Sequence, residues 1–419
     1  MAEVLPLQAL HYDLERVGSL GDVVAPPYDV IDDEQRNQLV ARSPYNVVEL
    51  DLPRDPGGGD PYEHSAALLA KWTGEGVLTR DTEPQIWALE QDYTAPDGSR
   101  LTRRGFLARV KLAPYGEGIR PHERTQPGPK EDRLRLTRAT HANLSPIFAL
   151  HPGNAWQHLE PALGDQPWGE VTDSDGTTHR VWRVGDPAVH GAVTAELDAG
   201  ELLIADGHHR YETSLAYQQE VGPGGNADYV LMALVSLDDP GLTVFPTHRL
   251  LAARTDDPAA REETLREAVT EIFDIEQVPV ADLDPAGVDG VGVFGFLESR
   301  NERCFRIRLR DTARLDEALA GHSDAYRTLD AAILEELVLK GIVGMTTEDI
   351  AAKRGIGYTP HIAEVFKKLA AGDYRAGFVL RATPVDQVRA VAAAGETMPP
   401  KSTYFFPKLL TGIAFNPLG

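Results

Sequence analysis

The stretch LIADGHHRYET, residues 203–213, sets one acid, two imidazoles and a guanidinium side by side between a short apolar run and a stretch with helical spacing. The apolar run is typical of a buried strand. A turn from a strand into a helix leaves the first N–H groups of the helix without partners inside the helix, at the edge of the sheet. The stretch therefore predicts a strand, a tight turn and a helix, with chemistry at the turn.

The residues of this turn suit an anion. If Asp206 caps the helix, Gly207 lets a ligand approach the backbone closely. His208, His209 and Arg210 then lie at the positive end of the helix dipole, where each positive side chain is unfavourable by roughly 0.3–1 kcal/mol. An anion compensates for this charge, and we expect a phosphate. The alternative interpretation is that Asp206 only caps the helix and the histidines are surface residues.

A metal ion is a second candidate at the turn. Mg²⁺ accepts one or two carboxylates and shares its other positions with water and phosphate, so Asp206 is a candidate magnesium ligand. Zinc bound by both histidines is disfavoured, because consecutive helical residues point about 100° apart.

Two further clusters have similar chemistry. In PHERTQPGPKEDR, His122 and Glu123 lie on an expected loop, and Lys130 follows a Gly-Pro pair that opens another helix. Glu123 is a candidate base. Near the C-terminus, PPKSTYFFPK offers a cation and two hydroxyls of the kind that hold phosphate oxygens, on a loop stiffened by prolines. These residues are Lys401, Ser402 and Thr403.

Composition limits the partners of the chain. Its 419 residues carry a formal net charge of -23, which disfavours binding to nucleic acids and anionic membranes. The N-terminus has no cationic stretch followed by an apolar core, and no window reaches the apolar length of a membrane span. The single cysteine, Cys304, has no cysteine in the chain to pair with and stands at one end of an alternating strand pattern. We expect a cytoplasmic protein.

The pattern of elements predicts a mixed α+β fold. A helix is expected to end before Pro44, followed by a strand over residues 46–52. Hairpins are expected around Asp97-Gly98 and Gly176. The segment TTEDIAAKRGIGYTPHIAEVFKKLAAG resembles a helix-turn-helix, but its second helix has only Lys367 and Lys368 as cations, which favours ordinary helix packing.

Six motifs carry a resemblance to a known family. In order they are PPYDVI, HERTQPGPKEDR, SPIFAL, ADGHHRYET, FPTHRL and PPKSTYFFPK. Together they resemble the bacterial family called domain of unknown function 1015. The resemblance implies a ParB/sulfiredoxin-like core over residues 116–255, which contains the DGHHR loop. A long α+β extension over 1–115 would precede it, and a C-terminal α/β region over 256–419 would follow.

The motifs PHE (121–123), DGHHR (206–210) and PKST (400–403) are similar to those of free serine kinases, which transfer a phosphoryl group from a nucleotide to free L-serine. This resemblance implies that Glu123 activates the hydroxyl and that Asp206 is a catalytic or metal-associated acid. Residues 207–210 would meet the nucleotide phosphates, and we group Lys130 with them. Residues 401–403 would lie near the substrate, and we group His122 with them. PPYDVI has no counterpart in these shorter kinases.

Three functions remain open at this point. The leading one is a small-molecule kinase that uses Mg²⁺ and either ATP or ADP, with L-serine or a similar hydroxylated metabolite as acceptor. A second is a nucleotide-binding ParB-like regulator or DNA-associated module. A third is hydrolysis of a nucleotide or phosphoester, with water in place of the acceptor. PPYDVI itself is interpreted as a rigid turn in preference to a source of a second acid, Asp29.

Overall fold

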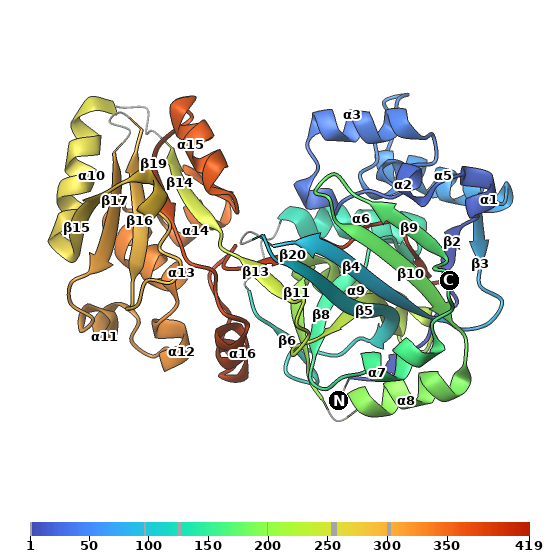
Figure 1. Ribbon diagram of the computed structural model, residues 1–419. Coiled ribbons are helices and arrows are strands. Elements are labelled where there is room, and N and C mark those ends of the chain that lie inside the picture. Colours follow the sequence, from blue (N-terminus) through green and yellow to red (C-terminus); the bar gives the residue numbers. More distant parts are fainter. Residues whose placement is uncertain (1, 96–97, 124–127, 199, 253–257, 300–302) are drawn as a thin grey trace. The chain divides into compact units, whose positions relative to one another are not determined.

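The computed structural model describes residues 2–95, 98–123, 128–198, 200–252, 258–299 and 303–419. The chain forms two compact units. The first contains Met1–Pro121, Pro127–Thr243 and Pro407–Gly419, and the second contains His122–Gln126 and Val244–Phe406. Both units combine helices with strands (Figure 1), which confirms the mixed α+β class. The ParB/sulfiredoxin-like core stays a prediction.

Nine strands of the described residues form the main sheet of the first unit. The strand order is β6-β11-β8-β12-β5-β4-β10-β9, and β1 pairs with β5. The pairs β6/β11 and β8/β12 are parallel, and the other pairs are antiparallel. The strands are β1 (Val4–Leu5), β4 (Ile86–Thr94), β5 (Arg100–Lys111), β6 (Ile119–Pro121), β8 (Ile147–His151), β9 (Gly169–Thr172), β10 (Thr178–Val184), β11 (Leu202–Asp206) and β12 (Tyr229–Ser236).

Burial explains the central strands of this sheet. Every residue of β8 is buried, and β12 is buried along nearly its whole length, as expected for continuous apolar runs inside a sheet covered on both faces. Their side chains join one core cluster that includes Phe106, Ile147, Ile204 and Met232. The hairpin of β9 and β10 around Gly176 confirms its prediction. Asp97, from the turn expected between β4 and β5, lies outside the described residues.

Helices and short strands complete the first unit. The helices are α1 (Leu14–Val17), α2 (Leu20–Val23), α3 (Asp33–Arg42), α4 (Val48–Asp51), α5 (Pro61–Gly74), α6 (Gly128–Thr140), α7 (Trp156–Leu159), α8 (Pro187–Leu197) and α9 (His208–Val221). The short strands are β2 (Leu10–Tyr12), β3 (Leu78–Arg80), β7 (Ala142–Asn143) and β21 (Asn416–Pro417). Helix α6 packs against both α5 and α9.

The predicted strand over residues 46–52 is wrong, because α4 occupies this place. The side chain of Asn46 accepts a hydrogen bond from the backbone N–H of Val48 and donates to the carbonyl oxygens of Asp22 and Val24. An Asn side chain that bonds the backbone two residues ahead forms a turn in place of a strand ladder. The predicted helix before Pro44 is confirmed as α3.

The second unit has a six-stranded antiparallel sheet within the described residues, in the order β15-β17-β16-β19-β14-β18. These strands are β14 (His248–Ala252), β15 (Phe273–Val278), β16 (Val293–Glu298), β17 (Cys304–Leu309), β18 (Ile356–Thr359) and β19 (Tyr374–Val379). A separate pair consists of β13 (Thr243–Phe245) and β20 (Tyr404–Phe406). Cys304 is buried at the start of β17, as its strand pattern predicts.

The helices of the second unit are α10 (Pro258–Ile272), α11 (Arg314–Ala318), α12 (Asp324–Arg327), α13 (Asp330–Ile333), α14 (Thr347–Ala351), α15 (Ile362–Ala370) and α16 (Val385–Ala393). A π-helical stretch, Leu334–Lys340, continues α13. Strand β18 lies in sequence between α14 and α15 and pairs with β14, so the segment that resembled a helix-turn-helix is part of the sheet architecture. Among the described residues, no helix has both the length and the apolar character needed to cross a membrane.

Candidate functional site

The DGHHR motif forms the predicted strand, turn and helix. Strand β11 ends at Asp206, which still pairs with Phe148 of β8, and α9 begins at His208. Gly207 precedes the helix in the left-handed conformation, with φ 95° and ψ 26°, which glycine adopts without a steric penalty. Asp206 therefore does not cap α9, and the cap proposed for it is wrong. Its carboxylate lies at the end of β11, beside the turn.

Two cations approach the Asp206 carboxylate. Lys408 Nζ donates a hydrogen bond of 2.7 Å to Oδ2, and Arg210 Nη2 lies 3.8 Å from Oδ1. The three side chains are between 14% and 28% exposed, so water screens them only in part. Lys408 was not among the predicted site residues, although it is the last residue of the PPKSTYFFPK motif.

Lys408 is placed by a buried polar network in the sheet of the first unit. Arg103 Nη2 donates to the carbonyl oxygen of Pro407 at 2.6 Å, and Gln91 Nε2 donates to that of Lys408 at 3.1 Å. Arg103 Nε in turn donates to Gln91 Oε1 at 2.9 Å. Burial lowers the pKa of the Arg103 guanidinium to about 10. These bonds tie the backbone that carries Lys408 to β4 and β5.

The guanidinium of Arg210 folds back over the glycine turn. A Cβ atom at position 207 would lie 2.9 Å from Arg210 Nε, so a side chain there would displace this guanidinium, while the positive φ is what requires glycine. Arg210 Nη1 also donates to the carbonyl oxygen of Pro146. His208 is buried, and His209 is half-buried. The structure thus brings all five DGHHR residues and Lys408 to one turn.

Lys130 lies in the first turn of α6, in the same unit, and pairs with Glu212 of α9. Thr213 of α9 donates a hydrogen bond of 3.4 Å to the carbonyl oxygen of Lys130. This pairing gives Lys130 a role in joining the two helices. Its role as a phosphate ligand stays a prediction.

A second cluster, in the second unit, contains the PHE motif. The His122 ring is almost completely buried, and its Nε2 shares a hydrogen bond of 2.8 Å with Thr403 Oγ1. Glu123 Oε2 lies 3.9 Å from the same nitrogen, and its side chain is 18% exposed. The backbone N–H of Met398 donates to the carbonyl oxygen of His122, which fixes the segment. The structure therefore joins His122, Glu123 and Thr403, as expected.

The loop before β20 is tightly bonded. Ser402 is buried, and its Oγ donates to the carbonyl oxygen of Pro399 at 2.6 Å. Thr383 Oγ1 donates to the carbonyl oxygen of Ser402 at 3.1 Å. Lys401 has a φ of 59°, which is uncommon for a residue with a side chain and clusters at functional sites. Ser402 thus has a structural role in the loop, and Lys401 is held in a strained conformation.

Arg249 is a site residue that sequence reasoning underrated. It is buried, donates from Nη2 to the carbonyl oxygen of Pro400 at 3.3 Å, and lies over the ring of Tyr358 at 5.1 Å. Burial lowers the pKa of its guanidinium, while Tyr358, Glu335 and Glu123 raise it. Its FPTHRL motif was noted, but a single arginine in an apolar strand is a weak signal. The structure places this cation within electrostatic reach of Glu123.

His248, next to Arg249, predicts a pH dependence of stability. Burial, Arg249 and His361 lower the pKa of His248 to about 4, and its Nδ1 accepts a hydrogen bond from the backbone N–H of Leu380. A histidine with a lowered folded pKa contributes stability that is present above its unfolded pKa of about 6.5 and is lost as the pH falls toward its folded pKa. The full contribution is about 3 kcal/mol.

We therefore expect the His248→Asn variant to lose much less stability than the parent protein when the pH falls from about 6.5 to about 4. Urea unfolding followed by circular dichroism at several pH values measures this slope for the parent and the variant. Data above about pH 7 provide the baseline, since His248 is neutral there in both states. Equal slopes for the two proteins would assign the pH dependence to other groups.

Comparison with protein families identifies the chain. The family model described as protein of unknown function (DUF1015) matches residues 4–332. The chain belongs to the DUF1015 family. This membership confirms the resemblance carried by the six motifs, and its description assigns no activity. No sequence among the curated proteins matches this DUF1015 chain significantly.

Solved structures similar to the DUF1015 chain are distant. A conserved hypothetical protein from Pyrococcus furiosus is 15% identical with a TM-score of 0.38, covering 74% of this chain and 94% of that one. A mutant free serine kinase in complex with ADP is 12% identical with a TM-score of 0.40, covering 74% and 91%. SbnI from Staphylococcus aureus, with a C-terminal truncation, is 12% identical with a TM-score of 0.37, covering 73% and 85%. Function has to be argued from the residues themselves.

Proposed function

We propose that this protein is a kinase that transfers a phosphoryl group from ATP or ADP to the hydroxyl of free L-serine or a similar metabolite. The observation that carries the proposal is the convergence of Asp206, Arg210 and Lys408 on the glycine turn that begins α9. Phosphoryl transfer depends on positioning and on donors and cations that stabilise charge on the phosphate oxygens. This turn offers these groups together.

In the first unit, the proposal assigns the phosphates of the nucleotide to the turn. The first backbone N–H groups of α9 point out of the helix toward the anion, and Arg210 and Lys408 add positive charge. In a chain with a net charge of -23, such a local site favours a small, compact anion over a polymer.

Asp206 is the proposed ligand for Mg²⁺. No group of three or more His, Cys, Asp or Glu side chains is placed to hold a metal ion in the part of the chain that the structure describes. A single carboxylate still fits Mg²⁺, which binds one or two carboxylates together with phosphate oxygens and water. When bound, the ion would neutralise charge on the phosphates. Asp206 also orients Lys408 through their hydrogen bond.

In the second unit, the proposal assigns the acceptor to the cluster around Glu123. The hydroxyl oxygen of the acceptor forms the new bond to the terminal phosphorus, and the bond from this phosphorus to the bridging oxygen breaks. The hydroxyl proton passes to the Glu123 carboxylate, and ADP or AMP leaves. The His122 to Thr403 hydrogen bond orients the imidazole beside Glu123. Lys401 supplies a positive charge suited to the carboxylate of an amino acid.

The test is a product assay. The purified protein is incubated with Mg²⁺, with ATP or ADP in turn, and with L-serine or a pool of hydroxylated metabolites, and products are identified by mass spectrometry beside a control without acceptor. We expect phosphoserine or another phosphorylated metabolite. Phosphate released without an acceptor would support hydrolysis instead. Nucleotide binding without any product would support a nucleotide sensor.

Asp206→Asn tests the role of the turn. The variant loses the charge that orients Lys408 and that would hold the metal, so we expect nucleotide affinity in the presence of Mg²⁺ to fall at least about tenfold. Asp186→Asn is the matched control, because Asp186 also lies between a strand and a helix, but caps α8. Isothermal titration with ADP measures both variants. Equal affinities for the two variants would place the nucleotide elsewhere.

A further inference from the structure

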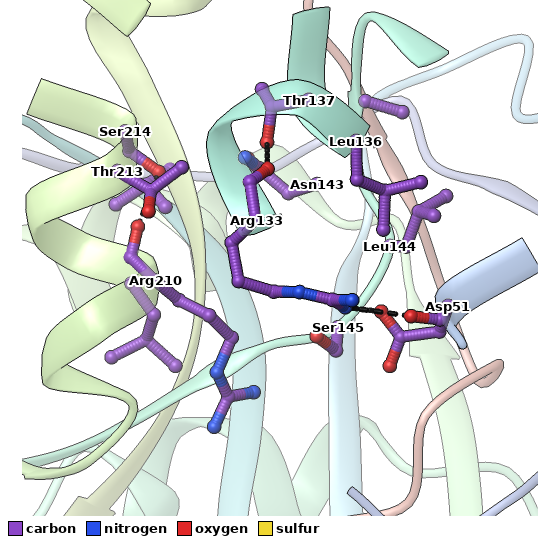
Figure 2. A pocket seen from close by; sticks show the side chains of 13 residues that line it. Asp51, Arg133, Leu136, Thr137, Asn143, Leu144, Ser145, Arg210, Thr213 and Ser214 are labelled. Carbon is purple, nitrogen blue, oxygen red and sulfur yellow. Dashed lines mark hydrogen bonds and ion pairs between the residues drawn. The ribbon is translucent and has the colours of Figure 1, made fainter. Parts of the chain in front are cut away.

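A small cavity with both polar and apolar walls lies in the first unit, lined in part by Arg210 (Figure 2). Its volume is about 30 Å³. One water needs roughly 10–15 Å³ by this measure, whereas pockets for drug-sized ligands have roughly 300–1,000 Å³. Helices α6 and α9, the end of α4 and the segment around Ser145 contribute its walls. The cavity is therefore too small for a nucleotide and suits a small ion.

Asp51, the last residue of α4, lines the cavity with a buried carboxylate. Arg133 Nη1 donates to Oδ1 at 3.1 Å and to the carbonyl oxygen of the same residue at 2.6 Å. Oδ2 is buried and has no hydrogen-bond partner among the described residues. Buried carboxylate oxygens are rarely left unsatisfied, because each lost partner costs free energy. A ligand that donates a hydrogen bond would therefore satisfy Oδ2.

The remaining polar walls supply donors. Arg133 and Arg210 both line the cavity, and each also pairs with a second carboxylate, Asp132 at 2.7 Å and Asp206 at 3.8 Å. Arg210 donates to Pro146 and lies near Asp206, which leaves further N–H groups of its guanidinium for a ligand. Ser145 adds a hydroxyl, which lies near the Arg133 guanidinium in Figure 2. Arg133, Arg210 and Ser145 together supply the hydrogen-bond donors that an anion needs.

The PPYDVI motif belongs to this cavity through Arg133. Tyr28–Val30 form a 3₁₀ turn, and the ring of Tyr28 lies 4.2 Å from the Arg133 guanidinium carbon. Burial raises the pKa of Tyr28 to about 12, so its hydroxyl stays neutral. Asp29 is exposed. The motif thus acts as a rigid turn that holds Arg133 in place, rather than as a source of a second acid.

We propose that this cavity binds a protonated phosphate, with inorganic phosphate as the ligand. Its bare oxygens accept from Arg133, Arg210 and Ser145, and its O–H group donates to Asp51 Oδ2. Sulfate has the same shape but carries no proton at neutral pH, so it leaves the carboxylate facing an unprotonated anion oxygen. The site therefore discriminates between the two anions. It shares Arg210 with the proposed nucleotide site, but phosphate binding here needs no nucleotide and no kinase reaction.

The test compares inorganic phosphate, methyl phosphate and sulfate near neutral pH by isothermal titration of the full chain. We expect phosphate to bind at least about tenfold more tightly than sulfate. Asp51→Asn replaces the acceptor oxygen with an amide that also donates, so the preference for phosphate disappears or reverses. Ser145→Ala leaves the Asp51 to Arg133 pair intact and should weaken phosphate binding about tenfold. This variant tests the proposal even if Asp51→Asn does not fold.

Asp132→Asn is the matched control. Asp132 Oδ2 accepts from Arg133 Nε at 2.8 Å but does not line the cavity, so its loss is expected to preserve the preference for phosphate. If methyl phosphate binds more tightly than inorganic phosphate and its binding depends on Asp51 in the same way, the ligand of this site is a phosphate monoester. Equal binding of phosphate and sulfate, a preference that persists in Asp51→Asn, or no binding by any of the three would overturn the proposal. Kinase assays of the Ser145→Ala variant show whether phosphate binding at this cavity and the proposed kinase activity are lost together or separately.

Discussion

Replacing Glu123 with glutamine is expected to lower the turnover of phosphoserine formation by about 10²–10⁴-fold, with little change in nucleotide affinity. The glutamine amide keeps the size of the side chain but cannot accept the hydroxyl proton. Because Glu123 is assigned to the acceptor and not to the phosphates, the loss should appear in kcat much more than in KM for the nucleotide. Steady-state kinetics with mass-spectrometric detection, together with nucleotide titration, measures both quantities.

Glu364→Gln provides the matched control for this prediction. Glu364 belongs to the same unit, and its carboxylate accepts a hydrogen bond from Thr359 Oγ1 at 2.8 Å. It takes no part in the proposed mechanism, so its variant should retain turnover. Unchanged turnover in Glu123→Gln would remove Glu123 from the role of base. A loss of nucleotide affinity in that variant would instead indicate a structural role for the His122 to Thr403 cluster.

The turn of the candidate site could be predicted from the sequence because its signals are local. A buried apolar run, one glycine and helical spacing within residues 203–213 specify the strand, the turn and the helix. The cap was misassigned for an equally local reason. Asp is a preferred cap residue, but Gly207 takes the capping position here by adopting positive φ, and Asp206 stays in the sheet.

The cations around the site could not be placed by such reasoning, because long-range packing decides their positions. Lys408 and Asp206 are 202 positions apart in the chain, and Arg103 reaches Pro407 over 304 positions. A sequence pattern indicates that a lysine is present, but it does not indicate which carboxylate the lysine will meet. Arg249 shows the same limit, since only the folded loop brings Pro400 to its guanidinium.

The misassigned strand at residues 46–52 illustrates how one polar side chain overrides a propensity. Its valines and leucines are typical of a strand, and Val47, Val48 and Leu50 are indeed buried. Asn46 nevertheless turns the backbone into α4 through three hydrogen bonds. This change matters for function, because α4 ends at Asp51 and so delivers a carboxylate to the cavity beside Arg210.

Arg133→Met is expected to destabilise the first unit by about 3–5 kcal/mol, because it leaves the buried Asp51 carboxylate without its cation. Both side chains of the pair are about 95% buried, with 5% and 6% exposed. For a unit of this size, the midpoint of thermal unfolding should fall by roughly 6–20 °C, which differential scanning calorimetry measures. Methionine retains apolar bulk, so lost charge accounts for most of the effect.

Arg135→Met separates this effect from the general loss of an arginine. Arg135 is in the same helix, also pairs with an aspartate, Asp60 at 2.8 Å, and also lies over a tyrosine ring, that of Tyr62 at 4.4 Å. Its pair is 48% and 41% exposed, so water screens it and its loss should cost at most about 1 kcal/mol. Equal falls in the unfolding midpoint for the two variants would refute a special role of the buried pair.

The loss of stability in Arg133→Met, called the deficit here, should itself depend on pH, which provides a second check. Burial raises the pKa of Asp51, and Arg133 is the largest influence that lowers it. Without Arg133 the folded pKa rises further, so the folded variant takes up a proton more readily than the unfolded chain as the pH falls. The deficit should therefore be larger at about pH 8 than at about pH 5. Adding Asp51→Asn to Arg133→Met removes the stranded charge, and should recover part of the stability and abolish this pH dependence.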